Sequence, residues 1–141
     1  QPSVAFSVLI CFEDTVAKLS RESVRNGARL LINQTNDAWF EPSSAAKQQM
    51  IQCVFRCVEN GVPAVRCGNT GVSCVIDRRG RVVALLADEN GCTRVVGFKT
   101  AQVDVPGEAL PRTFYNQYGD VFAWSCVGLF LLAAGLLLKL R

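Results

Sequence analysis

The stretch "SVLICFEDTV", residues 7–16, sets a cysteine at the end of an apolar segment and follows it with two acids. The surrounding run "VAFSVLIC", residues 4–11, is apolar almost throughout, which predicts a buried strand that ends at Cys11. The chain has no histidine. A Cys–His or Ser–His–Asp site therefore cannot be built from its residues, and the acids beside Cys11 become the feature to explain.

The residues that follow this strand predict a helix and then a second strand. Residues 15–27, "TVAKLSRESVRNG", are typical of a helix with Asp14 or Thr15 as its N-cap and Gly27 just past its end. Residues 28–35, "ARLLINQT", predict the next strand. A strand–helix–strand unit normally pairs its two strands in parallel through a right-handed crossover. We therefore expect an α/β fold.

The remaining part of the globular region predicts a long helix and further strands. A helix is expected over residues 44–60, ended by Gly61. Its predicted buried stripe consists of Met50, Ile51, Val54, Phe55 and Val58. Strands are expected at residues 62–67, at 72–77 and 81–87 as a hairpin through the turn "RRG", and at 97–105.

Cys11 is the candidate nucleophile. It stands where a strand ends and a helix begins, and amide N–H groups at a helix start favour a thiolate and can hold an oxyanion. Ligands of such sheets also bind outside the carboxyl ends of the strands. The competing interpretation is a buried structural cysteine, because the chain has seven cysteines and free cysteine is often buried.

Glu13 has two interpretations of equal weight. Without histidine the proton acceptor must be a carboxylate or a lysine, and Glu13 is adjacent in sequence. Around a tight turn, however, its side chain can point away from the sulfur. It would then be a structural carboxylate that binds backbone amides of the turn.

Residues 121–138, "VFAWSCVGLFLLAAGLLL", form a run of 18 residues without a charge. As a helix this run is about 27 Å long, close to the thickness of one hydrocarbon core. Unlike a core helix it has no polar face, which predicts a membrane span. Lys139 and Arg141 follow the run and Asp120 precedes it, so the positive-inside tendency places the C-terminus in the cytoplasm. We expect a globular domain at 1–119 and a transmembrane helix with a short tail at 120–141.

The composition excludes some classes of function. A net charge of +3 is too small to indicate nucleic-acid binding. The seven cysteines form no C-x-x-C pair and no histidine accompanies them, so we expect no metal site and no cofactor. Cys53 and Cys57, four residues apart on the predicted long helix, are interpreted as small core residues.

Four motifs carry a family resemblance that spans essentially the whole chain. They are "ICFED", "LLINQTNDAWF", "RCGNTGVSCVIDRRGRV" and "TFYNQYGD", the last directly before the span. Together they closely resemble the C-terminal part of the apolipoprotein N-acyltransferase family. These are bacterial inner-membrane enzymes with a nitrilase-like domain outside the membrane. The cysteine turn and the "N-x-G-x-S…D-x-x-G" hairpin are shared by the nitrilase superfamily, whereas "NDAWF" and the "YGD"-plus-span ending single out the acyltransferases.

The resemblance implies the C-terminal part of an αββα sandwich and a Glu–Lys–Cys triad. The nucleophile carries over to Cys11, and Glu13 matches an acid with a supporting role. Trp39 matches a tryptophan near the entrance for the acyl chain, and Phe40 beside it could shelter the chain as well, although both could instead pack into the domain. The base glutamate and the lysine of the family lie upstream of the matched part, and neither Lys18 nor Lys47 matches that lysine.

Two positions depart from the family pattern. The family usually has "QH" on the long helix, where this chain has Gln48–Gln49, and a glycine often stands at the position of Glu41. These departures affect local helix and loop contacts. They leave the nucleophile itself unchanged.

The implied reaction is acyl transfer. Cys11 takes a fatty acyl chain from a phospholipid as a thioester, and the N-terminal amine of a diacylglyceryl-cysteine on an apolipoprotein then takes it as an amide. The implied partners are these two lipids and the bilayer. The implied location is the bacterial inner membrane, with the globular part periplasmic and the C-terminus cytoplasmic.

Two rival functions are left open. One is a membrane-anchored amidase of nitrilase type, with the same cysteine but water as acceptor. The other is an inactive, truncated domain that binds lipid or a partner. The abrupt start at Gln1 and Pro2 indicates the C-terminal part of something longer, and we expect residues 1–141 alone to lack activity.

Overall fold

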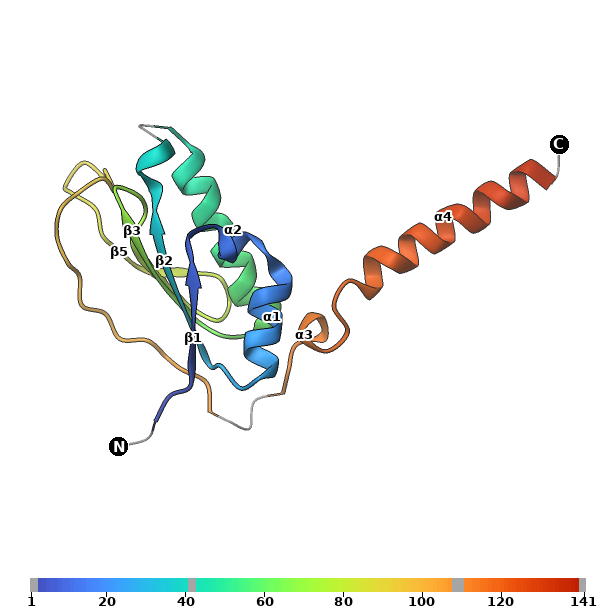
Figure 1. Cartoon of the computed structure of the whole chain (residues 1–141), viewed down its shortest axis with the longest axis horizontal. Coiled ribbons are helices and arrows are strands. Elements are labelled where there is room, and N and C mark those ends of the chain that lie inside the picture. Colours follow the sequence, from blue (N-terminus) through green and yellow to red (C-terminus); the bar gives the residue numbers. More distant parts are fainter. Residues whose placement is uncertain (1–2, 41–42, 108–110, 140–141) are drawn as a thin grey trace.

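The computed structural model describes residues 3–40, 43–107 and 111–139. Strand β1 (Phe6–Ile10), helix α1 (Ala17–Arg25) and strand β2 (Leu30–Asn36) form the predicted strand–helix–strand unit (Figure 1). The two strands are parallel, with Phe6 opposite Leu30 and Ile10 opposite Gln34. The parallel pairing predicted from the sequence is confirmed.

The turn between β1 and α1 differs from the prediction. A separate 3-10 helix, η1 (Cys11–Thr15), follows β1 directly, and α1 begins after Val16 without a side-chain cap. Neither Asp14 nor Thr15 caps α1, so that prediction is wrong. The carboxylate of Asp14 is buried and paired with Arg66, and the Thr15 hydroxyl donates to the carbonyl of Phe12 at 2.7 Å.

The second half of the sheet follows the predicted order. Helix α2 (Ala45–Asn60) ends at Gly61, whose φ of 68° lies in the left-handed region. Strand β3 (Ala64–Asn69) pairs parallel to β2, and the hairpin of β4 (Cys74–Ile76) and β5 (Val82–Leu85) adds antiparallel strands. The resulting sheet has the order β1-β2-β3-β4-β5.

The helices α1 and α2 lie on one face of this sheet (Figure 1). The core packs between that face and α2; its fully or almost fully buried apolar residues include Leu9, Leu31, Cys53, Cys57, Ala64 and Ile76. The prediction that Cys53 and Cys57 are core residues is confirmed. The prediction of a wholly buried first strand is wrong, because Phe6, Val8 and Ile10 point to the opposite face and are exposed.

The buried stripe of α2 is rotated from the predicted one. Met50 is buried and Val54 is partly buried against the core, as predicted, but Ile51, Phe55 and Val58 are exposed. The core-facing side of the helix is instead an adjacent face. Besides Met50, its buried residues are Gln49, Cys53, Arg56, Cys57 and Asn60. Polar residues turn inward here because they bind carbonyl and amide groups of neighbouring segments. The Arg56 guanidinium, for example, donates to the Thr15 carbonyl at 3.1 Å.

The strand predicted at residues 97–105 does not form. The segment runs without ladder pairing across the uncovered face of the sheet, where Gly97, Phe98 and Ala101 lie against β3, β4 and β5. Phe98 is 91% exposed, so the segment is only loosely apposed to the sheet, and within the described residues 97–105 no backbone hydrogen bond to a strand is found. Glu41, one of the two departures from the family pattern, lies outside the described residues.

A short helix connects the globular part to the apolar run. Helix α3 (Phe114–Tyr118) is capped by Thr113, which accepts from the Asn116 amide at 3.0 Å. Arg21 on α1 donates to the Asn116 carbonyl at 3.0 Å and to the Gln117 carbonyl at 2.9 Å, which ties α3 to the domain.

Helix α4 (Val121–Lys139) extends away from the sheet and its helices (Figure 1). The helix has 19 residues, is apolar apart from Ser125 and the terminal Lys139, and is long enough to cross a membrane; none of its apolar stretch is buried within the described chain. The predicted helix therefore forms. Arg141, which entered the orientation argument, lies outside the described residues.

Candidate active site

Cys11 occupies a strained backbone position at the carboxyl end of β1. It is the first residue of η1, and its φ of 51° places it in the left-handed region, which residues with a Cβ rarely adopt. Such a conformation costs on the order of 1–3 kcal/mol and persists only where the surroundings fix it. The half-buried thiol thus sits at an elbow between strand and helix, as the sequence predicted.

Two side-chain amides hold the carbonyl oxygen of Cys11. Asn33 on β2 donates through Nδ2 at 3.1 Å, and Gln49 on α2 donates through Nε2 at 3.2 Å. Both side chains are buried. Each hydrogen bond contributes roughly 1 kcal/mol net, so the two together are comparable with the strain of the elbow. We call this pair of contacts the carbonyl clamp.

Glu13 supports the same turn from the other side. Its Oε2 atom accepts from the backbone amide of Ile10 at 2.7 Å. This is the geometry of a carboxylate that binds backbone amides, one of the two interpretations that the sequence left open. A part for Glu13 in catalysis, like that of Cys11, stays a prediction.

A buried guanidinium links the elbow to the centre of the sheet. Arg66, in the middle of β3, donates through Nη1 to Asp14 Oδ2 at 2.5 Å and to Asn33 Oδ1 at 2.9 Å. Its Nη2 atom donates to Asp37 Oδ2 at 3.0 Å. The side chains of Arg66 and of both aspartates are fully buried. Arg66 thus holds the side-chain oxygen of Asn33, and the side-chain nitrogen of Asn33 donates to the Cys11 carbonyl.

Burial raises the pKa of Asp14, and the negative charge of Asp37 adds to that rise. The charge of Arg66 and the neighbouring Gln49 amide act in the opposite direction. Asp14 is therefore a carboxylate whose ionised form depends on Arg66. Removing the guanidinium would leave an unpaired acid directly beneath the elbow.

Trp39 and Phe40 lie in a second 3-10 helix, η2 (Asp37–Phe40), directly after β2. The Trp39 side chain is 84% exposed, whereas Phe40 is half-buried. Asp37 anchors this helix from below by accepting from the Thr35 hydroxyl at 2.8 Å as well as from Arg66. Trp39 therefore does not pack into the described part of the chain.

Gly71 makes room for Asp37. A Cβ atom at Gly71 would lie 1.9 Å from Asp37 Oδ2, so only glycine allows this close approach. The preceding Thr70 has a φ of 57°, again in the left-handed region. The "TG" pair that follows β3, Thr70 and Gly71, thus leaves space for the carboxylate that anchors η2.

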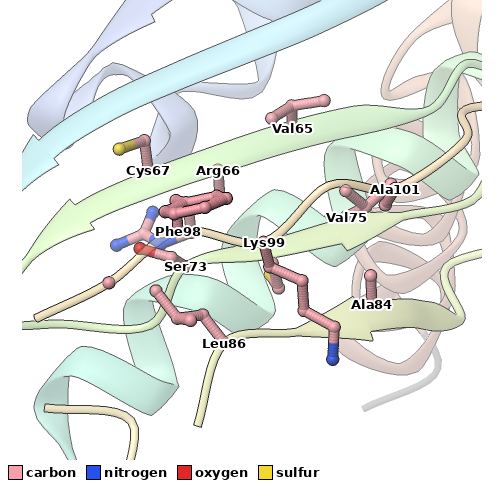
Figure 2. A pocket seen from close by; sticks show the side chains of 12 residues that line it. Val65, Arg66, Cys67, Ser73, Val75, Ala84, Leu86, Phe98, Lys99 and Ala101 are labelled. Atoms are coloured by element: carbon pink, nitrogen blue, oxygen red, sulfur yellow. The ribbon is translucent and has the colours of Figure 1, made fainter. Parts of the chain in front are cut away.

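A separate apolar groove of about 240 Å³ lies on the uncovered face of the sheet (Figure 2). Strands β3, β4 and β5 and the segment 97–101 line it, with Val65, Val75 and Phe98 among its walls. The groove is not lined by Cys11 or Trp39. It is a gap between the sheet and the crossing segment, and we assign it no part in the chemistry.

The sequence missed the residues that support Cys11. Arg66, Asn33 and Gln49 were not singled out as site residues, although each carries a readable signal. Arg66 and Asn33 are polar residues inside otherwise apolar strands, and such residues need buried partners. Gln49 was noted only as a departure from the family's "QH". In the structure Asn33 and Gln49 contact Cys11 directly, and Arg66 contacts Asn33 from the middle of β3.

Comparison with known families and proteins gives consistent matches. The family model of carbon-nitrogen hydrolases matches residues 2–105. Apolipoprotein N-acyltransferase from Geobacter metallireducens is 47% identical over 125 residues, which are 85% of this chain and 22% of that protein. Apolipoprotein N-acyltransferase from Thermotoga maritima is 37% identical over 125 residues, which are 89% of this chain and 23% of that protein. The chain therefore spans about a fifth of the length of these curated relatives.

Solved structures agree on the fold. The carbon-nitrogen hydrolase from Helicobacter pylori superposes with a TM-score of 0.51 at 16% identity, covering 57% of this chain and 35% of that one. A mutant of the amidase from Nesterenkonia sp. AN1 gives 0.50 at 21% identity, covering 61% and 36%. At this identity the likeness shows the fold alone. The predicted nitrilase-like α/β class is confirmed.

Proposed function

Because this chain belongs to the carbon-nitrogen hydrolase family, we propose that it carries the nucleophile of an apolipoprotein N-acyltransferase. The observation that carries the proposal is the strained elbow at Cys11, at the carboxyl edge of the parallel strands, in a chain that also holds an apolar helix of membrane-spanning length. The names of the Geobacter and Thermotoga relatives supply the reaction class.

In the first half-reaction the Cys11 thiolate attacks an ester carbonyl carbon of a phospholipid. The carbon–oxygen bond to the glycerol breaks, the glycerol oxygen takes up the proton that left the thiol, and a lysophospholipid departs. The acyl chain remains on Cys11 as a thioester. In the second, the N-terminal amine of a diacylglyceryl-cysteine on an apolipoprotein attacks the thioester, an amide forms, and the thiol is regenerated with the amine proton.

Proton transfer needs groups beyond those that contact Cys11 here. In the described residues, the hydrogen bonds of Cys11 run through its carbonyl oxygen to Asn33 and Gln49. We assign the base to the glutamate and the oxyanion contact to the lysine that the family carries upstream of the matched part. Glu13 then supports the turn through Ile10.

The membrane helix fits substrates that are confined to a bilayer. We place the globular part, residues 1–119, on the periplasmic side of the inner membrane and residues 120–141 in the membrane and cytoplasm. Lys139 at the end of α4 supports this orientation. The exposed Trp39 and its neighbour Phe40 would contact the acyl chain and keep water from the thioester.

The test is to trap the acyl intermediate on the native protein. The protein is tagged at the C-terminus, extracted from its own membrane and incubated with a phospholipid that bears a labelled acyl chain. We expect a hydroxylamine-labile label on the peptide that contains Cys11, and its release on addition of a diacylglyceryl-cysteine peptide. Cys11→Ser should abolish the thioester, whereas Cys67→Ser, which changes an exposed thiol on β3, should leave it intact.

Three results would overturn the proposal in different ways. Absence of a label on Cys11 excludes acyl transfer through this residue. Release of the acyl chain to water regardless of the amine, with turnover of small amides, indicates an amidase. An intact mass near 15.4 kDa together with no label would indicate an inactive domain that binds lipid or a partner.

A further inference from the structure

The polypeptide is held on both sides of Cys11. On the N-terminal side, the peptide unit between Leu9 and Ile10 is fixed at both of its polar atoms. The Leu9 carbonyl accepts from Asn33 Nδ2 at 3.4 Å, and the Ile10 amide donates to Glu13 Oε2 at 2.7 Å. This unit therefore has little freedom to rotate.

On the C-terminal side, the carbonyl clamp fixes the peptide unit that follows Cys11. Asn33 and Gln49 both donate to the Cys11 carbonyl, from β2 and α2 respectively. The Cα atom of Cys11 lies between the two fixed units. Contacts from β2, from α2 and from Glu13 within the turn thus hold the backbone on both sides of the residue whose φ is 51°.

Gln49 differs from Asn33 in what else it does. Asn33 is also an acceptor for Arg66, so changing it would disturb the buried ion pairs as well as the elbow. Gln49 reaches the elbow from a separate helix. Its side-chain amide donates to the Cys11 carbonyl at 3.2 Å and also neighbours the Asp14 carboxylate, where it acts to lower the pKa that burial raises. It is 6% exposed, although the preceding Gln48 on the same helix points to solvent. A buried glutamine needs a partner, and one of its partners here is the nucleophile's own carbonyl.

We propose that Gln49 is a positioning residue for the nucleophile. Its side-chain amide holds the Cys11 carbonyl, keeps Cys11 in the left-handed conformation and so aims the thiol out of the strand end. This inference rests on the proposed role of Cys11 as nucleophile. It assigns Gln49 no contact with substrate.

The decisive variant is Gln49→Met, which keeps the length and volume of the side chain but removes the N–H donor. The matched control is Gln48→Met, the same change at the exposed neighbouring position. Gln49→His is the rescue variant, because a neutral imidazole restores an N–H group near the same place. All are made in the native protein and extracted from its membrane.

Two readouts separate positioning from a merely structural role. The first is the rate of thioester formation on Cys11 in a single turnover, measured as a function of phospholipid concentration. We expect Gln49→Met to lower the saturating rate at least about tenfold, without changing the concentration that gives half of that rate. Gln49→His should recover most of the loss, and Gln48→Met should match the native protein.

The second readout is the NMR chemical shift of the Cys11 Cα and Cβ nuclei in protein labelled with ¹³C-cysteine, assigned with Cys11→Ser. These shifts report the left-handed backbone directly. Gln49→Met should move them toward extended values while the signals of Cys67 and Cys92 stay in place. The NMR measurement needs no substrate. It therefore tests the positioning role of Gln49 even if acyl transfer itself is disproved.

The inference is overturned if the Cys11 shifts do not move in Gln49→Met. It is also overturned if that variant loses thermal stability but keeps the native rate of thioester formation, which is the signature of a structural residue. A Gln49→His variant no faster than Gln49→Met would equally contradict the role of the N–H donor.

Discussion

Arg66 and Asp14 form an ion pair that joins the middle of the sheet to the turn carrying the candidate nucleophile. The Nη1 atom of Arg66 lies 2.5 Å from Oδ2 of Asp14, and both side chains are inaccessible to solvent. Asp14 is three residues beyond Cys11, whereas Arg66 is on the third strand. A contact between distant parts of the sequence thus fixes the end of the local turn η1.

Arg66→Met is expected to destabilise the fold strongly. The apolar side chain leaves the carboxylates of Asp14 and Asp37 buried without their cation, and loss of one partner of a buried pair costs about 3–5 kcal/mol. The measurement is urea-induced unfolding of the detergent-solubilised protein. Arg81→Met is the control, because the Arg81 side chain of the Arg81–Asp77 pair is 69% exposed and its loss should destabilise the fold far less. Equal losses in the two variants would contradict the assigned roles.

Gly71→Ala should displace η2. The added Cβ would meet the Asp37 carboxylate, and overpacking of this kind costs about 1–3 kcal/mol or more. We expect a lower melting temperature and a change in the fluorescence of Trp39, which lies on the displaced helix. Gly107→Ala serves as the control because its Cβ would have no atom within 4 Å. Unchanged Trp39 emission in Gly71→Ala would show that Asp37 does not anchor η2.

The cysteines should divide into two classes toward iodoacetamide. Burial raises the pKa of Cys74 to about 12, and hydrogen bonding with Cys53 together with burial raises the pKa of Cys57. These thiols should therefore stay unmodified in the folded protein even at pH 10, while the exposed Cys67 and Cys92 react. Peptide mass spectrometry gives the modification of each residue. Modification of Cys57 before unfolding would show that α2 is not packed on the sheet as described.

Asp77 should make the β4–β5 turn sensitive to acid. Hydrogen bonds from the Arg81 and Arg79 amides and the charge of Arg81 lower its pKa below the ordinary 3.8. Because the folded pKa is the lower one, the carboxylate stabilises the turn above pH 3.8, and this contribution disappears as pH falls through the folded value.

Asp77→Asn tests this pH dependence. Hydrogen exchange at the Arg79 and Arg81 amides should be faster in the variant than in the native protein at pH 6. The difference should shrink toward pH 3. A difference that is independent of pH would assign the effect to side-chain shape instead of charge.

The sequence was sufficient where local pattern determines structure. Alternating strands and helices predicted the order of β1 to β5, and the cysteine between a strand and a helix start located the elbow. The sequence was misleading where tertiary contacts outweigh the local hydrophobic pattern. Ile51, Phe55 and Val58 have helical spacing, yet α2 turns Gln49 and Arg56 inward because the elbow carbonyls need donors.

Two further differences have the same physical origin. The apolar segment 97–105 has the composition of a strand, but pairing requires an available edge, which a single sequence does not reveal. The exposure of Phe6, Val8 and Ile10 depends on whether a second layer covers that face of the sheet. The carbonyl clamp was equally invisible, because Asn33 and Gln49 meet Cys11 only after three elements have packed.

The buried cluster around Arg66 has a consequence for how this sequence can change over time. Each member of the set Asp14, Asn33, Asp37 and Arg66 is acceptable only in the presence of the others, so single replacements are selected against one by one. Joint replacement by well-packed apolar residues is expected to preserve stability or even increase it. Such a variant would fold with its elbow unsupported. Selection on folding alone would therefore permit the joint loss of these polar residues, although their single loss is costly.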